Sequence, residues 1–81
     1  MSSSTWDTQN LVLQELLRDV RKNSELTQLE LASLLNRPQS YVSKYESGER
    51  RLDLLEIRNI ANCCGLKLQE FTVELETRLL K

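Results

Sequence analysis

The sequence predicts an all-α fold in a single small domain, and three observations support this prediction. Only two glycines and one proline interrupt the 81 residues, so few positions break a helix. The apolar residues make up 40% of the chain and recur at spacings of three and four, the period of a helix with one buried face. No alternation typical of a strand competes with it. A chain of this size and composition builds one modest core without metal or disulfide support.

The chain is expected to open with a disordered tail, residues 1–6, followed by one domain over residues 7–81. Met1 to Thr5 is rich in serine and threonine, and no apolar stretch follows that would make it a signal sequence. The first helix is predicted from about Asp7 to Lys22 and ends at Asn23. Its inner face is expected to hold Leu13, Leu16, Leu17 and Val20.

A capping box marks the start of the second helix. The hydroxyl of Thr27 is able to accept a hydrogen bond from the first turn, and Glu30 stands three residues on, where its carboxylate reaches back. The helix is predicted over Gln28 to Leu35. It stops because Asn36 tolerates a left-handed backbone and the following residue precedes proline. Its buried residues are expected to be Leu31, Ala32 and Leu35.

The third helix starts at a proline and ends before a glycine. Pro38 suits the first helical position, where its missing amide would have had no partner. Gly48 most easily takes the positive φ that closes a helix. We predict a helix up to Ser47, with Val42 and Tyr45 buried.

Two further helices complete the predicted fold. Asp53 or a neighbour opens the fourth, which reaches about Cys64 and is closed by Gly65. The fifth runs from Gln69 to Leu80. The apolar residues of the fourth are Leu54, Leu55, Ile57, Ile60 and Ala61, and those of the fifth are Phe71, Val73, Leu75, Leu79 and Leu80.

Charge is distributed unevenly along the chain. The net charge of −1 and the pI near 5.4 give no argument for nucleic acid by themselves. Residues 37–51, however, hold four cationic side chains against two anionic ones, whereas residues 1–36 hold three against five. This locally positive segment includes the second of two short helices separated by a three-residue turn. Such a pair, braced by other helices, lets its second helix enter a major groove about 12 Å wide.

The segment from Thr27 to Arg51 resembles the lambda-repressor-like (Cro/Xre-type) helix-turn-helix family; it reads TQLELASLLNRPQSYVSKYESGERR. The likeness extends from about Leu16 to Phe71, and it implies a five-helix DNA-binding domain of that type. Its landmarks are Gln28, Ala32, Asn36, Val42 and the run from Glu46 to Gly48. The sequence departs from the family pattern in the turn, where Asn36 stands at a common glycine position and Arg37 at an often apolar one. Both are compatible with the fold.

Four outward residues of the third helix are candidate base readers: Gln39, Ser40, Ser43 and Lys44. The resemblance implies base reading by Gln39 and Ser40, and a glutamine at this place pairs with adenine through two hydrogen bonds. Lys44 lies one turn further, where it donates to guanine or to a phosphate, and Ser43 faces the same groove. The alternative is that the glutamine and the serines are ordinary solvated residues. For Tyr41 the sequence leaves three alternatives: a surface position, a contact to a phosphate through its hydroxyl, or packing at a subunit boundary.

The candidate phosphate contacts are Gln28, Arg37, Arg50 and Arg51. Gln28 is similar to family glutamines that contact a phosphate and support the first glutamine of the recognition helix. Arg50 and Arg51 would lie along the DNA backbone and contribute affinity rather than specificity; the alternative is a solvated charged loop. Comparison with relatives also implies that Arg21 and Glu46 form a partly buried structural ion pair.

The sequence lacks the residues that a disulfide framework, a metal site or a catalytic site would need. The vicinal Cys63 and Cys64 do not bridge each other without strain, so we expect reduced thiols in the cytoplasm. One of them is most simply a small buried hydrophobe, and a redox switch is the alternative. Without histidine, a glycine-rich phosphate loop or a nucleophile beside a base, we expect no metal, no cofactor and no enzyme. No run approaches the roughly 18 apolar residues of a membrane span.

The last helix has two possible roles. It closes the core through Phe71 and Leu75, and it either does nothing more or also forms an interface between subunits. Val73, Leu79 and Leu80 add apolar surface that one small domain does not cover, so we expect a symmetric homodimer. Two half-sites about one helical turn apart then form a palindromic operator. The predicted function is sequence-specific transcriptional regulation, by blocking or by recruiting. The alternative is an antitoxin-like or adaptor module that masks a protein partner.

Overall fold

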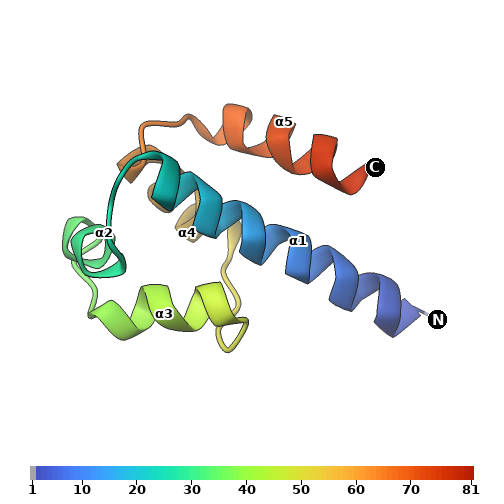
Figure 1. The fold of residues 1–81 in the computed structure, drawn as a ribbon, viewed down its shortest axis with the longest axis horizontal. Helices are drawn as coiled ribbons and strands as arrows, with labels where there is room; N and C mark the ends of the chain where they lie inside the picture. Colours follow the sequence, from blue (N-terminus) through green and yellow to red (C-terminus); the bar gives the residue numbers. More distant parts are fainter. Residues whose placement is uncertain (1) are drawn as a thin grey trace.

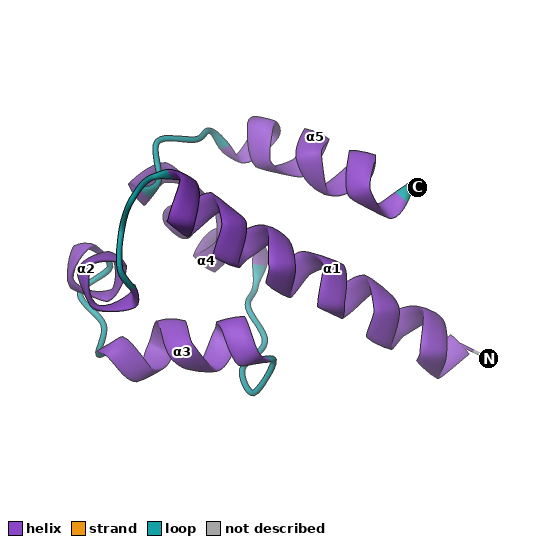
Figure 2. Ribbon diagram, in the orientation of Figure 1, coloured by secondary structure: helices purple, strands orange, loops and turns teal. Residues whose placement is uncertain are grey.

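Five helices and no strand occur in residues 2–81, the part of the chain that the computed structural model describes; side chains are described from Trp6 onward (Figures 1 and 2). The helices are α1 (Ser2–Asn23), α2 (Gln28–Leu34), α3 (Gln39–Ser47), α4 (Leu54–Cys63) and α5 (Leu68–Leu79). The predicted all-α, five-helix fold is confirmed. Within the described residues, no helix combines the length and the apolar character needed to cross a membrane.

Helix α1 starts earlier than predicted. It begins at Ser2 rather than near Asp7, so residues 2–6 are helical where a disordered tail was expected, and Met1 lies outside the described residues. Contacts in the next turns hold this end in place. The Asn10 side chain donates to the carbonyl of Trp6 at 2.9 Å, and the guanidinium of Arg51 lies 5.2 Å from the centre of the Trp6 ring. Both contacts lie at the turn that follows the serine- and threonine-rich residues.

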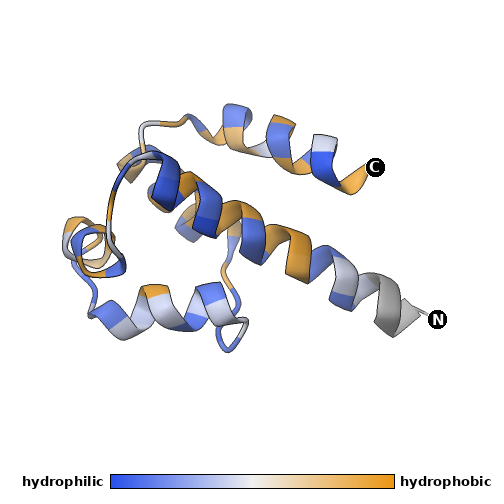
Figure 3. Cartoon of the chain, in the orientation of Figure 1, coloured by the Kyte–Doolittle hydropathy of each residue, from blue (hydrophilic) through white to orange (hydrophobic). Residues whose placement is uncertain are grey.

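Helix α1 runs through the middle of the fold. In Figure 1, α5 lies along one side of α1, α2 and α3 lie on the other side, and α4 lies behind. Contacts between α1 and α3, and between α1 and α5, join the two sides. Apolar residues are concentrated in the middle turns of α1, where these helices meet (Figure 3). All five helices supply the core, which consists of Leu16, Leu17, Val20, Leu31, Ala32, Tyr41, Val42, Tyr45, Ile60, Ala61 and Phe71.

The predicted signals at the ends of α2 and α3 are confirmed. The backbone amide of Glu30 donates to the Thr27 hydroxyl at 3.1 Å, and the Thr27 amide donates to the Glu30 carboxylate at 2.9 Å. Asn36 takes a left-handed conformation with φ of 57°, and Gly48 closes α3 with φ of 87°. The turn between the two helices therefore has the backbone that the sequence predicts.

Some details of the turns differ from the prediction. Pro38 caps α3 from outside, with ψ of 156°, and the helix begins at Gln39. The proline carbonyl still accepts from the amide of Tyr41 at 2.9 Å. Leu35 is half-buried at the C-cap of α2 rather than fully buried. Glu25 has a positive φ of 63° in the turn between α1 and α2, where no glycine or asparagine signalled one.

Candidate nucleic-acid interface

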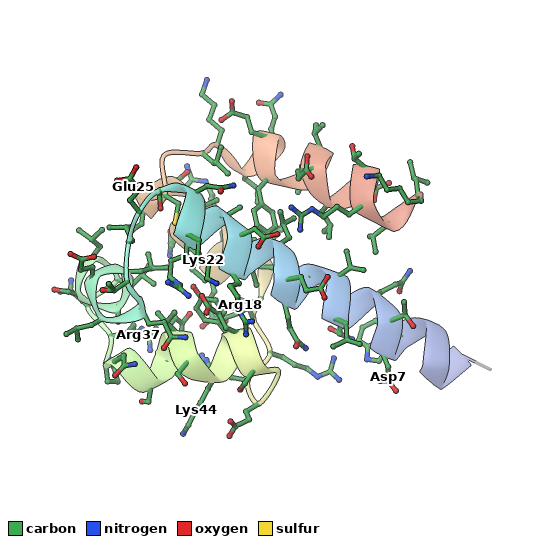
Figure 4. The ribbon with its side chains drawn as sticks, in the orientation of Figure 1. Asp7, Arg18, Lys22, Glu25, Arg37 and Lys44 are labelled. Atoms are coloured by element: carbon green, nitrogen blue, oxygen red, sulfur yellow. The ribbon has the colours of Figure 1, made fainter. Side chains whose placement is uncertain are left out.

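Helix α3 is anchored by one face and exposes the other. Val42 and Tyr45 point into the core with relative exposures of 0% and 1%. The four predicted base readers lie on the opposite face, and all are exposed: Gln39, Ser40, Ser43 and Lys44. Figure 4 shows Lys44 projecting from α3 away from the rest of the protein. The short helix thus presents a row of polar side chains on a rigid support.

The turn fixes α3 against α2. The amide of Arg37 donates to the carbonyl of Ala32 at 2.9 Å, and the amide of Asn36 donates to that of Ser33 at 3.1 Å. Ala32 is fully buried, and its small side chain allows the two helices to pack closely. The predicted helix-turn-helix geometry is present.

A chain of polar side chains links the outer face of α3 to the core. Gln39 Nε2 donates to Gln28 Oε1 at 3.1 Å, and Gln28 Nε2 donates to Glu46 Oε1 at 3.0 Å. The carboxylate of Glu46 in turn accepts from Arg21 at 2.7 and 3.0 Å. The structure therefore joins in one network the predicted ion pair and the two predicted glutamines. The supporting contact predicted between the two glutamines is observed.

The ion pair of Arg21 and Glu46 is buried more deeply than predicted, with relative exposures of 8% and 3%. The guanidinium also donates to the carbonyl of Leu26 at 3.0 Å, so it ties α1 to both the turn before α2 and α3. Its hydrogen bonds to Glu46 raise the pKa of Arg21 above its ordinary value. Arg18 approaches the same carboxylate at 3.8 Å and points from α1 towards α3 (Figure 4).

The predicted phosphate-contacting arginines are exposed, but they are not free solvated side chains. The guanidinium groups of Arg37 and Arg50 lie 5.0 and 4.9 Å from the centre of the Tyr41 ring. Arg51 lies over Trp6, in a separate place. Cation–π contacts of this kind hold a guanidinium in position and leave its N–H groups available to other acceptors.

Two residues of this region were not predicted as part of the site. Tyr41 is 9% exposed, so it is largely buried rather than a surface residue. Its hydroxyl donates to Glu56 Oε2 at 2.9 Å, and Arg50 Nη2 donates to the same oxygen at 2.7 Å. The only sequence signal for Glu56 is its place three residues after Asp53, the spacing of a second capping box.

The apolar residues of α5 do not share one face. Val73 and Leu80 are 65% and 81% exposed, whereas Leu79 is half-buried. Leu79 lies four residues after Leu75 and eight after Phe71, and this spacing places it on the core side of the helix. The end of α5 is fastened to α1 by an ion pair of 2.9 Å between Arg78 and Asp19. Of the three residues predicted for the interface, Val73 and Leu80 are the most exposed, and the assignment of all three stays a prediction.

The two cysteines are unpaired and half-buried at the end of α4. Both pack against the core, and burial raises the pKa of the Cys64 thiol. Across the described part of the chain, no group of three or more histidine, cysteine or acidic side chains is arranged to hold a metal ion.

Comparisons with known proteins give a family match and a structural match. A family model described as helix-turn-helix matches residues 17–71. A solved structure, the XRE-family like protein from Pseudomonas syringae pv. tomato str. DC3000, superposes with a TM-score of 0.87 at 35% sequence identity, over 95% of this chain and 94% of that one. None of the curated proteins matches the sequence.

Proposed function

The chain belongs to the Xre-type helix-turn-helix family, and on this basis we propose that it is a sequence-specific transcriptional regulator that binds a palindromic operator as a homodimer. Proteins of this family are DNA-binding regulators and are typically not enzymes. The observation that supports the proposal most directly is the exposed polar row on α3, since a helix of about 10–12 Å diameter fits a major groove about 12 Å wide.

Base reading is assigned to Gln39, Ser40, Ser43 and Lys44. The first of these is the best oriented, because its amide is held by Gln28 while its outer edge stays exposed. An amide presented in this way offers a donor and an acceptor, the pair that adenine requires. The serines accept or donate at any base, and the lysine donates to guanine or to a phosphate.

Phosphate contacts are assigned to Gln28, Arg37, Arg50 and Arg51. The guanidinium groups of Arg37 and Arg50 are held together over Tyr41, and that of Arg51 is held over Trp6, so the positive charge of this region is gathered at two places on the surface. Contacts of this type orient a protein on the duplex and provide affinity without reading sequence.

The dimer interface is assigned to the outer face of α5. Val73 lines a shallow hollow with Lys67 and Gln69, and these two residues also line the adjoining groove that contains the exposed Leu54. An apolar surface of this kind, rimmed by polar side chains, is typical of a protein–protein interface. A symmetric pair of this kind matches the symmetry of a palindromic operator.

Selection of bound sequences from a random duplex pool tests the proposal. We expect a palindrome with half-sites about 10 base pairs apart, or a multiple of that spacing. Gln39→Ala should relax the preference at one or two positions in each half-site, because it removes both hydrogen bonds to the base edge. Gln9→Ala, a change at an exposed glutamine of α1 outside the assigned contacts, is the control and should leave the preference intact. A pool without enrichment would refute sequence-specific binding, and a single half-site would refute the dimer.

The interface has its own test in the absence of DNA. Val73→Glu places a charge on the outer face of α5 and should convert the dimer to a monomer, as measured by light scattering. Leu29→Glu changes a residue of similar exposure on α2, at 64% against 65%, and should leave the mass unchanged. A monomeric unmodified protein, or a dimer unaffected by the first change, would exclude this interface.

A further inference from the structure

An aromatic ring on α3 sits between two arginines that are thirteen residues apart. The guanidinium groups of Arg37 and Arg50 lie 5.0 and 4.9 Å from the centre of the Tyr41 ring. The ring also meets the edge of Tyr45, with centroids 5.6 Å apart, so it is fixed from the core side. Residues from both ends of α3 are therefore held at one point of the surface.

A single carboxylate completes this cluster. Glu56 Oε1 accepts from the backbone amide of Asp53 at 2.9 Å and thereby caps α4. Its other oxygen, Oε2, accepts from the Tyr41 hydroxyl at 2.9 Å and from Arg50 at 2.7 Å. The two oxygens therefore have different roles, since one holds the helix and the other holds the arginine.

The ion pair is exposed enough for its partners to be exchanged. The side chain of Arg50 is 42% exposed and that of Glu56 is 19% exposed. The amide of Asp53 and the guanidinium of Arg50 lower the pKa of Glu56, so this group stays ionised at neutral pH. A guanidinium in such a pair attracts phosphate less than a free one, because its charge is already compensated.

We propose that Glu56 is a positioning residue that holds Arg50 in the free protein and competes with DNA phosphate for it, so that it limits the affinity for DNA of any sequence. The proposal rests on the proposed function, since it requires DNA as the partner. It assigns opposite effects to the two members of the ion pair: Arg50 strengthens DNA binding, and Glu56 weakens it.

The test is Glu56→Gln, with binding to a random-sequence duplex measured over a series of salt concentrations. The amide oxygen still accepts from the Asp53 amide, so α4 keeps its cap, while the compensating charge on Arg50 is lost. We expect binding to become roughly two- to fivefold tighter per protomer, which corresponds to an exposed ion pair. The dependence of log K on log salt should become steeper by up to about 0.9, the contribution of one neutralised phosphate.

A control variant separates this effect from a general change of charge. Glu70→Gln removes the same charge from the same capping position, because Glu70 accepts from the amide of Lys67 on α5, far from α3 (Figure 1). It should bind with the salt dependence of the unmodified protein. Thermal unfolding verifies that each variant is folded, and Glu56→Ala provides a second removal of the carboxylate with the same expected direction.

The outcomes distinguish this inference from the proposed function. Failure of the unmodified protein to bind the duplex at any salt concentration would overturn both. Salt-dependent binding by the unmodified protein, with no change or a weakening on Glu56→Gln, would overturn this inference alone. Tightening by Glu70→Gln as large as that by Glu56→Gln would also overturn this inference alone.

Discussion

Replacing Glu46 by glutamine is expected to destabilise the protein strongly. The carboxylate is 3% exposed and accepts three hydrogen bonds, two from Arg21 at 2.7 and 3.0 Å and one from Gln28 at 3.0 Å. Glu46→Gln exchanges one acceptor oxygen for an NH₂ group, which then faces N–H donors. It also leaves the buried guanidinium of Arg21 without a counter-charge. Loss of one partner of a buried ion pair costs about 3–5 kcal/mol.

That loss is large for a domain of this size. At the usual stability per residue, 81 residues give a free energy of unfolding of roughly 4–12 kcal/mol. Urea unfolding at low temperature, followed by circular dichroism, should therefore show a midpoint at a much lower urea concentration. The slope of the free energy of unfolding against urea concentration should be unchanged. The difference should persist at high salt, because a buried pair is screened little.

Arg18→Ala is the matched control. Arg18 approaches the same carboxylate at 3.8 Å, but its side chain is 50% exposed. An exposed pair contributes at most about 1 kcal/mol, and salt should remove that contribution. If Glu46→Gln costs less than about 1 kcal/mol, or no more than Arg18→Ala, the buried network does not stabilise the fold through its charge pair.

Three further predictions concern stability, each measured as the free energy of unfolding in urea. Gly48→Ala and Gly65→Ala, at φ of 87° and 82°, should each cost about 1–2 kcal/mol; the first should cost slightly more, because its Cβ would meet Gln14 Nε2 at 2.7 Å and displace that flexible side chain. Equal stability to the parent in both would contradict the strain argument. Thr27→Ala should cost about 1 kcal/mol through loss of the α2 cap, and a neutral result would show that the cap is dispensable. Burial raises the pKa of Tyr45, so the folded state favours the protonated phenol. The free energy of unfolding is therefore unaffected by this group below pH 10.0, the ordinary value, and falls as the pH rises beyond it. Because its hydroxyl is buried without a partner in the described structure, Tyr45→Phe should stabilise by about 1 kcal/mol and reduce the alkaline loss, and a destabilised variant would argue for an unseen partner.

The parts of the fold that could be predicted from the sequence are those fixed by local chemistry. The cap at Thr27 depends on two side chains three residues apart, and the ends of α2 and α3 depend on single residues that accept a positive φ. The anchoring of Val42 and Tyr45 follows from helical spacing alone. The roles of Gln28 and Glu46 were predicted instead from the resemblance to a family. These two residues are eighteen positions apart, and no local sequence pattern indicates that their side chains meet.

The parts that were missed depend on packing between distant segments. The first turns of α1 are held in place near Trp6 by Arg51, which is forty-five residues away. Tyr41 is buried because two guanidinium groups cover it, and no spacing rule predicts that cations will cover an aromatic ring. Leu79, which was assigned to the interface because it is apolar, is half-buried on the side of the helix that holds Leu75.

The buried charge of Glu46 also determines the direction of the hydrogen bonds that reach the surface. A carboxylate only accepts, so the Gln28 amide must turn its nitrogen inward and its oxygen outward. That oxygen only accepts as well, so Gln39 must give it one N–H. Gln39 then keeps its own oxygen and a second N–H, an acceptor and a donor in a fixed order, which is what the proposed pairing with adenine needs. A group in the core that both donates and accepts, such as an amide or a hydroxyl, would allow both glutamine amides to reverse. The ion pair that holds α3 to α1 is therefore also the reason that an exposed glutamine has one orientation rather than two.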